Sequence, residues 1–415
     1  MRRWIALFLI GLMAISVVAS GCISGGGGTA TGTSEKKGAI AIVYDVGGRG
    51  DLSFNDMAYL GASKAAKDFN LQLVELQSNS EDDYIKNLRT LASQKKYLVI
   101  IAVGFMMTDA VNKTAAEYPN QKFVLIDGYD PNMPKNVMMI LFKENEGSAL
   151  AGALAGLIAA NDGKDKVGIV LGMEIPPLYK FEAGYRFGVK WAEDYYKQKT
   201  GKTANIDVLY QYTGVFNDAA KGKAAAQAQL QQGAWVIYQV AGGTGLGVFD
   251  AVADTLKAEG KKMGPPFAIG VDSAQDWIKP GVIIASMMKR VDVGVYTAVK
   301  DAVNGNFKGG VLELGLKENG VGLSTVDDVM AMFDSLPEET QKQKLKDLGF
   351  NSKEELKQYL EQTRSQVPDW IWQAVNELKQ EIISGKIKVP APMDKQGIEA
   401  VRNAKTWQDM EKLAK

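Results

Sequence analysis

The feature that most restricts the fold of this chain is a repeated alternation of short apolar segments with amphipathic ones. In a first series we predict strands at 39–44, 71–76, 97–103 and 122–126, with helices at about 55–69, 81–95 and 108–118 between them. Such alternation is typical of an α/β fold, in which a parallel sheet carries helices on its faces.

A second series repeats this order. We predict strands at 166–171, 206–210, 235–240 and 267–271, with helices at about 178–197, 219–232 and 247–259. In both series the third strand runs into a glycine-containing loop, and the fourth strand ends at an acid, Asp127 or Asp272. We therefore predict an α/β fold of two Rossmann-like lobes with one architecture. Two unrelated α/β domains are the alternative.

The chain beyond the second series adds further elements. A strand at 282–287 and a helix at 292–304 follow, and we expect the open edge of the first lobe to receive this strand. The chain then crosses between the lobes more than once, which gives a multi-strand hinge. Residues 144–160 are rich in Ala, Gly and Leu, which suits close helix packing.

A charged, helix-favouring region at 325–384 predicts a C-terminal helical appendage on the second lobe. We also predict a late strand at 386–392 and a short helical tail. The expected organisation is lobe I at 38–143 plus about 276–312, lobe II at 144–275 plus about 313–390, and a tail at 391–415.

The N-terminal segment predicts export. Arg2 and Arg3 precede an uncharged apolar run at 4–19, and small residues lead to Cys22. This pattern is typical of a signal peptide at 1–21 followed by a lipidated cysteine. Residues 22–37 are then a flexible linker, because they contain little that can be buried. The alternatives are an uncleaved membrane anchor and a cysteine buried in the core.

Composition excludes several classes of function. The 48 basic and 48 acidic residues balance, so the protein has no charge excess for binding nucleic acid. The chain contains no histidine and a single cysteine, which excludes Ser-His-Asp and Cys-His catalysis and the usual zinc sites. We expect no metal and no cofactor.

The candidate binding residues follow the predicted strands. Ligands of open α/β sheets bind beyond the carboxyl ends of the strands. The candidates there are the acids Asp45, Asp127 and Asp272, the aromatics Phe54 and Phe216, and Lys289. Each has an alternative structural interpretation: a turn residue for Asp45, core packing for the aromatics and a solvated side chain for Lys289. Ser53 and Asp56 fit a helix capping box.

The glycine-rich loop at 241–247 follows a strand and opens a helix. This placement suggests a nicotinamide dinucleotide site with Asp272 on the ribose, but the spacing is G-x-G-x-G rather than G-x-G-x-x-G. The other interpretation is that Gly242 and its neighbours let backbone N–H groups approach a ligand closely.

Together these residue types favour a nucleoside-like ligand. Ionised carboxylates accept hydrogen bonds and donate none, which suits a ligand rich in hydroxyl and N–H groups. Aromatic side chains suit a flat ring. A phosphorylated ligand would be repelled by three carboxylates and would need more than one cation.

Several stretches carry a resemblance to a known family: DLSFN at 51–55, FVLID at 123–127, FEAGYRFG at 181–188, VAGGTGLGVF at 240–249, GVDS at 270–273, SMMKR at 286–290 and SGKIKV at 384–389. In these, the chain between about 38 and 389 resembles the basic membrane protein family, the purine-nucleoside-receptor type of lipoprotein in ABC importers. The resemblance implies a type I periplasmic binding protein fold.

The resemblance also implies residue roles. Phe54 and Phe216 match ring-stacking positions, and Asn55 and Asp127 match base-edge contacts. The remaining matches are Asp272 and Lys289 as ribose-hydroxyl contacts, Gly242 as a backbone contact, and Asp45 as a further ligand contact.

The sequence therefore predicts a monomeric, lipid-anchored receptor on the extracytoplasmic face of the cell membrane. It would bind a nucleoside, with a purine expected, and deliver it to the transmembrane subunits of an ABC permease without catalysing a reaction. The alternatives are a sensor ectodomain or regulator of the same fold, and a nicotinamide-dependent or nucleoside-hydrolysing enzyme.

Overall fold

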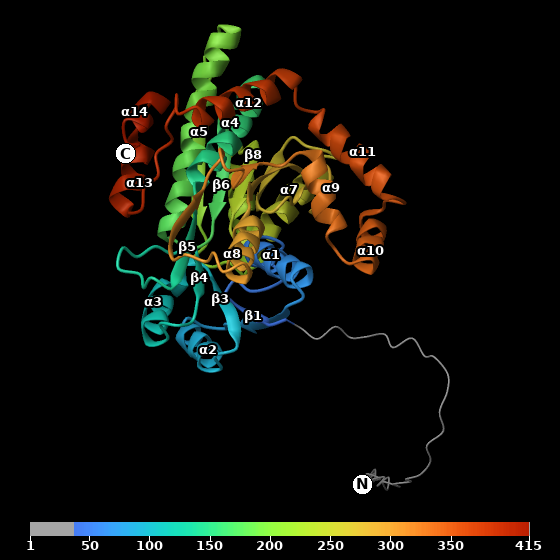
Figure 1. The fold of residues 1–415 in the computed structure, drawn as a ribbon. Helices are drawn as coiled ribbons and strands as arrows, with labels where there is room; N and C mark the ends of the chain where they lie inside the picture. The colour runs from blue at the N-terminus through green and yellow to red at the C-terminus, as the bar shows by residue number, and fades with distance from the viewer. Residues whose placement is uncertain (1–36, 415) are drawn as a thin grey trace, which may run out of the picture. The chain divides into compact units, whose positions relative to one another are not determined.

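The computed structural model describes residues 37–414. The predicted signal peptide, Cys22 and nearly all of the predicted linker lie outside the described residues. The described body contains two six-stranded sheets (Figure 1). In both sheets, strands that belong to the repeated βα units pair in parallel, as the alternation of strands and helices in the sequence predicts.

The first sheet has the strand order β11-β5-β4-β3-β1-β2. Its strands are β1 (Ala39–Tyr44), β2 (Gln72–Gln77), β3 (Tyr97–Val103), β4 (Phe123–Ile126), β5 (Val137–Phe142) and β11 (Gly310–Leu314). Its helices are α1 (Phe54–Asp68), α2 (Asp82–Ser93), α3 (Thr108–Glu117) and α8 (Val291–Val303). All six residues of β1 are buried, because helices cover both faces of this strand, which lies between β3 and β2. These elements form lobe I.

The second sheet has the order β12-β10-β9-β8-β6-β7, and β12 is antiparallel to β10. Its strands are β6 (Lys166–Leu171), β7 (Asp207–Tyr212), β8 (Val236–Val240), β9 (Phe267–Asp272), β10 (Ile283–Lys289) and β12 (Val321–Leu323). Its helices are α4 (Glu144–Asn161), α5 (Pro176–Thr200), α6 (Ala219–Gln231) and α7 (Leu246–Ala258). These elements form lobe II.

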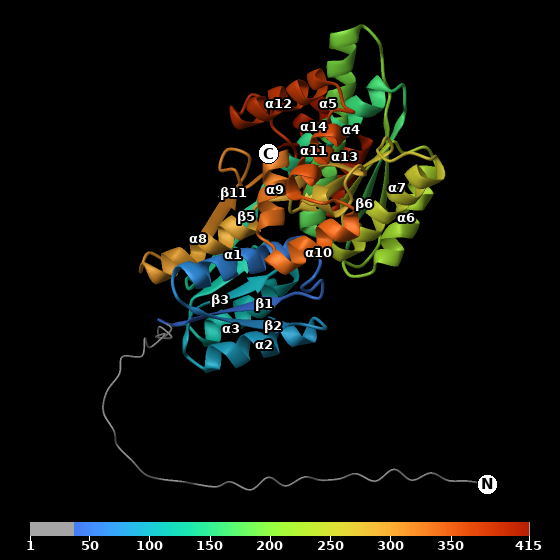
Figure 2. The ribbon, with the colours of Figure 1, turned by 90° about the vertical axis from the view of Figure 1, so that its right-hand side faces the viewer.

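The C-terminal part is helical, as predicted. The appendage comprises α9 (Val326–Asp334), α10 (Glu338–Leu348), α11 (Lys353–Arg364) and α12 (Asp369–Ile383), and the tail comprises α13 (Lys395–Asn403) and α14 (Trp407–Glu411). Helix α12 packs on α4, and both tail helices pack on α5. In Figure 2, α9 and α10 lie at the boundary between the two lobes.

The chain passes between the sheets after β5, after β10 and after β11. This arrangement is the predicted multi-strand hinge. However, the prediction that the strand at 282–287 joins the first sheet is wrong, since β10 pairs with β9 in the second sheet. Strand β10 is almost entirely buried, whereas the edge of the first sheet is taken by β11, whose residues are largely exposed. The apolar strand β10 suits a covered position in the second sheet better than the exposed edge of the first sheet.

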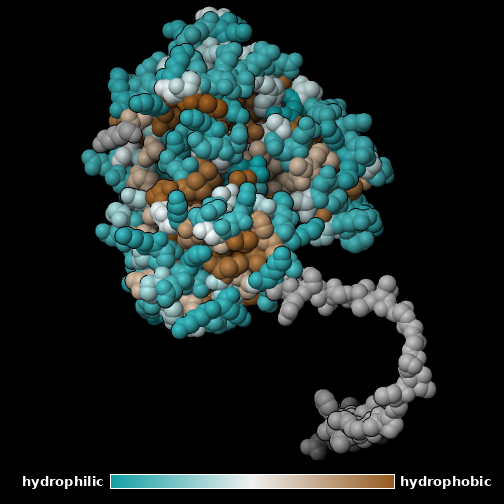
Figure 3. All heavy atoms as spheres, in the orientation of Figure 1, coloured by the Kyte–Doolittle hydropathy of each residue, from teal (hydrophilic) through white to brown (hydrophobic). Residues whose placement is uncertain are grey.

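The predicted late strand at 386–392 is also wrong, because this segment is irregular. Pro390 and Pro392 lack the backbone N–H that a sheet ladder requires. Within residues 37–414, no helix is both long enough and apolar enough to cross a bilayer. The face of the molecule in Figure 3 is largely hydrophilic, with apolar side chains gathered in separate patches.

Candidate ligand-binding site

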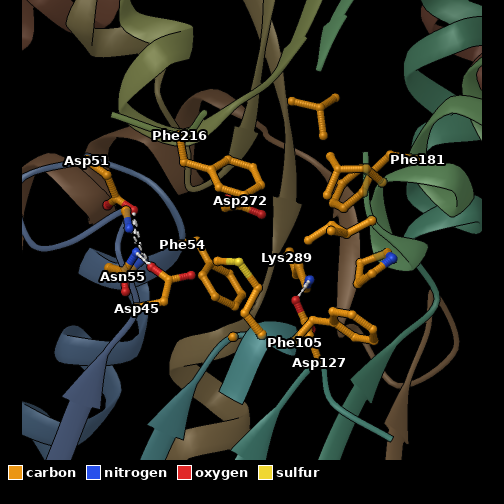
Figure 4. Close-up of a pocket in the computed structure, with 18 residues that line it drawn as sticks. Asp45, Asp51, Phe54, Asn55, Phe105, Asp127, Phe181, Phe216, Asp272 and Lys289 are labelled. Carbon is orange, nitrogen blue, oxygen red and sulfur yellow. Dashed lines mark hydrogen bonds and ion pairs between the residues drawn. The ribbon is translucent and has the colours of Figure 1, made fainter. Parts of the chain in front are cut away.

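One pocket lies between the two lobes, where the carboxyl ends of strands from both sheets meet (Figure 4). Its empty space is about 610 Å³, part of which is open to solvent. Every residue predicted to contact a ligand lines it: Asp45, Phe54, Asn55, Asp127, Phe216, Gly242, Asp272 and Lys289.

Asp51 organises the loop between β1 and α1. Its Oδ1 accepts hydrogen bonds from the backbone N–H groups of Ser53 and Asp56, at 2.9 and 3.1 Å, and its Oδ2 accepts one from the N–H of Asn55 at 2.9 Å. The predicted Ser53–Asp56 capping box is therefore wrong. Within the described chain the Ser53 side chain makes no capping bond, because Asp51 already satisfies the free N–H groups of the first turn.

The same loop fixes the orientation of the Asn55 side chain. Its Nδ2 donates to Asp45 Oδ1 at 3.0 Å and to Asp51 Oδ2 at 3.2 Å. With both amide hydrogens taken by carboxylates, only the carbonyl oxygen is left for another partner, and Asn55 Oδ1 is buried and unpaired within residues 37–414. Burial raises the pKa of Asp45 to about 6 and the pKa of Asp51 to about 7.

A buried ion cluster joins the lobes at the wall of the pocket. Lys289 Nζ, at the end of β10, lies 2.5 Å from Asp127 Oδ2 of lobe I and 2.9 Å from Oε1 of Glu144, the first residue of α4. Lys180 Nζ lies 2.5 Å from the other Glu144 oxygen. Burial opposes a charge on Lys289, but Asp127 and Glu144 raise its pKa above the usual value. The predicted alternative of a solvated lysine is wrong, since its side chain is 2% exposed.

Asp127 itself is only partly satisfied. Burial raises its pKa and the neighbouring Lys289 opposes that shift. Among the described residues, nothing hydrogen-bonds to Asp127 Oδ1, although this atom is buried. Asp127 directly follows β4 and Asp272 is the last residue of β9, and both have a left-handed backbone, at φ of 66° and 64°. The two lobes thus repeat one another down to the residue at the pocket.

Asp272 bonds across the cleft. Its Oδ2 accepts a hydrogen bond from Ser53 Oγ of lobe I at 2.6 Å, and burial raises its pKa to about 6 while Lys289 opposes the shift. Asn217 Nδ2 of lobe II also donates to the backbone oxygen of Val46 in lobe I at 3.2 Å. These bonds describe a closed arrangement of the lobes.

Aromatic rings line the pocket from both lobes (Figure 4). Phe54 begins α1, and Lys289 Nζ lies 5.0 Å from its ring centroid. Phe216 of lobe II lies over Gly172, where a methyl group added to the glycine would come within 2.1 Å of the Phe216 ring. Gly242 has a left-handed backbone, at φ of 53°, which favours glycine at this position.

Several lining residues were not predicted. They are Gly47, Asp51, Gly104, Phe105, Met106, Ile175, Pro177, Leu178, Phe181 and Val240. Phe105 and Met106 directly follow β3, and Ile175 to Leu178 follow β6, so the rule for strand ends could have found them. Phe181 lies a full turn inside α5, and its position depends on how that helix is oriented.

With this geometry in place, comparisons with known proteins identify the family. A family model described as ABC transporter substrate-binding protein PnrA-like matches residues 39–361. The chain belongs to this family. As a PnrA-like protein it is 44% identical over 389 residues to an uncharacterised lipoprotein of Pyrococcus abyssi, across 94% of this chain and 92% of that relative. It is 33% identical to the ABC transporter nucleoside-binding protein BmpA of Lactococcus lactis, across 78% of this chain and 91% of the relative.

A solved structure gives the same result. The ABC transporter solute-binding protein of Aeropyrum pernix K1 matches this PnrA-like chain with a TM-score of 0.80 and 37% identity, covering 91% of this chain and 99% of that one. The predicted basic membrane protein family and the predicted two-lobed periplasmic binding protein fold are both confirmed. The protein is a substrate-binding protein of the ABC transporter type.

Proposed function

We propose that this protein captures a nucleoside, preferably a purine nucleoside, between its lobes and delivers it to an ABC permease. The observation that carries the proposal is the convergence of four aspartate carboxylates and four phenylalanine rings, from both lobes, on one pocket. The name of the Lactococcus relative, a nucleoside-binding protein, agrees with this proposal.

The acceptors in the pocket favour a ligand rich in donors. Asp127 Oδ1 is buried and unpaired within the described body, and the carboxylate of Asp272 receives a single side-chain hydrogen bond, from Ser53. Buried acceptors without partners cost free energy, so hydroxyl or N–H groups of a ligand would stabilise them. Ribose hydroxyls and the edge of a base supply such donors.

Lys289 is the one lysine among the described residues that line the pocket, and this argues against a phosphorylated ligand. Lys289 Nζ already contacts the carboxylates of Asp127 and Glu144. A phosphate would have to compete with these two acids for the cation and would lie close to Asp272. An uncharged nucleoside does not compete with the acids for Lys289 and is not repelled by Asp272.

Isothermal titration calorimetry of ligand-stripped protein tests the proposal. We expect inosine, guanosine or adenosine to bind more tightly than uridine, and free ribose to bind weakly. Mass spectrometry of the small molecule that co-purifies with the protein should identify a nucleoside. Absence of binding by every nucleoside, or turnover of a bound nucleoside, would contradict the proposed role.

We further propose that Cys22 carries the lipid that holds the protein at the extracytoplasmic face of the membrane. Relatives named lipoproteins support this, as does the sequence before the cysteine. In cells, the parent protein should partition into detergent and a Cys22→Ser variant should not incorporate a labelled lipid precursor. Equal labelling of both proteins would overturn the assignment.

A further inference from the structure

The helical appendage builds an apolar cluster against lobe II. Its buried members are Ala274 and Trp277 from the β9–β10 connection, Val329 and Phe333 from α9, and Leu356 and Leu360 from α11. The rings of Trp277 and Phe333 meet edge to face, with centroids 5.6 Å apart. The appendage and the connection that follows Asp272 therefore share one small core.

A side chain from lobe I packs against this core. Leu52, in the loop between β1 and α1, contacts the cluster, and within residues 37–414 it is the one member of the cluster that belongs to lobe I. Its backbone oxygen accepts hydrogen bonds from Ser273 Oγ at 2.7 Å and from Gln275 Nε2 at 2.9 Å. Both its side chain and its carbonyl are thus bound by lobe II.

The backbone of Leu52 is held in an unusual conformation. Its φ is 50°, in the left-handed region that costs a leucine about 1–2 kcal/mol. Such a conformation persists where surrounding contacts impose it. Here the contacts that impose it come from the opposite lobe and from Asp56, which accepts a hydrogen bond from the Leu52 N–H at 3.0 Å.

The appendage also braces the connection that receives Leu52. Asp276 is buried and accepts hydrogen bonds from Ser286 Oγ at 2.6 Å and from Ser324 Oγ at 3.1 Å. Arg364 of α11 lies 3.9 Å from the Asp276 carboxylate and donates to the backbone oxygen of Ser324 at 3.1 Å. The appendage therefore contacts the β9–β10 connection at Asp276 as well as through the apolar cluster.

We infer that the appendage is a latch for domain closure, and that Leu52 is the residue it holds. Opening the cleft must withdraw Leu52 from the cluster and break the bonds to its carbonyl, so the cluster stabilises the closed form. A contact that favours the closed, binding-competent form raises ligand affinity without touching the ligand. Leu52 lies outside the set of residues lining the pocket in the described body, while its neighbour Ser53 bonds to Asp272 inside it.

The first test is hydrogen exchange of the full-length, ligand-free protein. In Leu52→Ala, peptides covering 271–278 should exchange about three- to tenfold faster than in the parent, the factor expected for losing about half of a buried leucine. The matched control is Leu60→Ala on α1, because Leu60 is half-buried against the main core and not against this cluster. Unchanged exchange in Leu52→Ala, or equal acceleration in Leu60→Ala, would overturn the inference.

The second test is the dissociation rate of inosine. Leu52→Ala and the milder appendage variant Phe333→Leu should both release it about three- to tenfold faster, and Leu60→Ala should not. Thermal denaturation shows whether each variant is folded. If the parent binds no nucleoside, the proposed ligand fails and the exchange experiment alone decides the latch. Release rates within twofold of the parent for both variants would overturn it.

Discussion

At the scale of single residues, Asp272 is both a bond between the lobes and a candidate ligand contact. Its carboxylate is buried, which is unfavourable for the ligand-free protein, and it accepts one hydrogen bond from Ser53. We expect Asp272→Ala to weaken nucleoside binding about 10- to 150-fold, the loss of a hydrogen bond to a charged group, with little change in stability. Calorimetry and denaturation measure the two effects separately.

Asp272→Asn and Asp250→Ala serve as controls. The first keeps one acceptor oxygen, so it should lose less affinity than Asp272→Ala. The second removes a carboxylate from the exposed face of α7, where Asp250 pairs with Lys279, and should bind as the parent does. Parent-like binding by Asp272→Ala would place the ligand elsewhere.

Two of the pocket acids predict a dependence of binding on pH. Burial raises the pKa of Asp45 and of Asp272 to about 6, so both lose their charge as the pH falls through 6. A protonated carboxyl accepts hydrogen bonds less strongly, and we expect nucleoside affinity to be highest above pH 7 and to decline towards pH 5. Calorimetry at pH 5, 6, 7 and 8 measures this.

Stability should respond to the same two groups in the opposite direction. The pKa values of both carboxyls are higher in the folded protein than in the unfolded chain. Between these values the folded state therefore binds more protons than the unfolded chain, so both groups stabilise the fold more at pH 5 than at pH 7. At pH 5 we therefore expect the parent protein to bind the nucleoside more weakly while its thermal unfolding transition remains intact. In Asp272→Asn the affinity should change less with pH than in the parent protein. If it changed as much as in the parent, a group other than Asp272 would cause the pH dependence.

The residue level also shows what could be predicted from sequence. The candidate acids, aromatics and lysine could be placed in one cleft because each follows a predicted strand, and parallel strands end at a common edge. The residue that caps α1 could not be predicted, because one short loop contains three suitable capping residues, Asp51, Ser53 and Asp56. Only the loop conformation decides that Asp51 accepts these bonds while Ser53 turns to the other lobe.

At the scale of elements, close helix packing depends on glycines of α4 and α5. A methyl group added at Gly188 would lie 2.0 Å from the backbone oxygen of Ala149, and one at Gly152 would lie 2.0 Å from the oxygen of Tyr185. We expect Gly188→Ala to destabilise the protein by about 1–3 kcal/mol, because the helices must move apart. This cost exceeds the gain of up to about 1 kcal/mol that alanine brings within a helix.

Chemical denaturation measures this effect, with Gly322→Ala as the control. Apart from Gly322 itself and its two chain neighbours, no described residue has an atom within 4 Å of a methyl group added at Gly322 in β12. Stability equal to the parent is expected for that variant. If Gly188→Ala were as stable as the parent, the helices would have to be less closely packed than described.

Strand positions within each βα repeat could be predicted, and strand partners could not. The apolar runs of β1, β3 and β6 identify them, since fully buried parallel strands are continuous in hydrophobicity. The apolar residues of β10 do not indicate which of the two sheets this strand joins. That choice depends on the whole topology, in which the poorly buried β11 takes the edge beside β5.

At the scale of the whole molecule, the buried ion cluster links both lobes and the hinge. Lys289 Nζ lies 2.5 Å from Asp127 Oδ2, and the side chains of Lys289, Asp127 and Glu144 are 2%, 8% and 1% exposed. Removing one partner of a buried pair leaves the other charge without compensation. We therefore expect Lys289→Met to lower the free energy of unfolding by about 3–5 kcal/mol at pH 8.

This loss should shrink as the pH falls. Without Lys289, the folded-state pKa of Asp127 rises further above its unfolded value, so the folded variant takes up a proton that the unfolded chain does not, and it regains stability. Lys64→Met is the matched control, because Lys64 Nζ lies the same 2.5 Å from Asp68 but its side chain is 62% exposed. Water already solvates that pair, so its stability should match the parent at both pH values. If Lys289→Met lost the same stability at pH 5 and at pH 8, the loss would come from packing and not from charge. The ion cluster at the pocket wall would then make no electrostatic contribution to holding the lobes together.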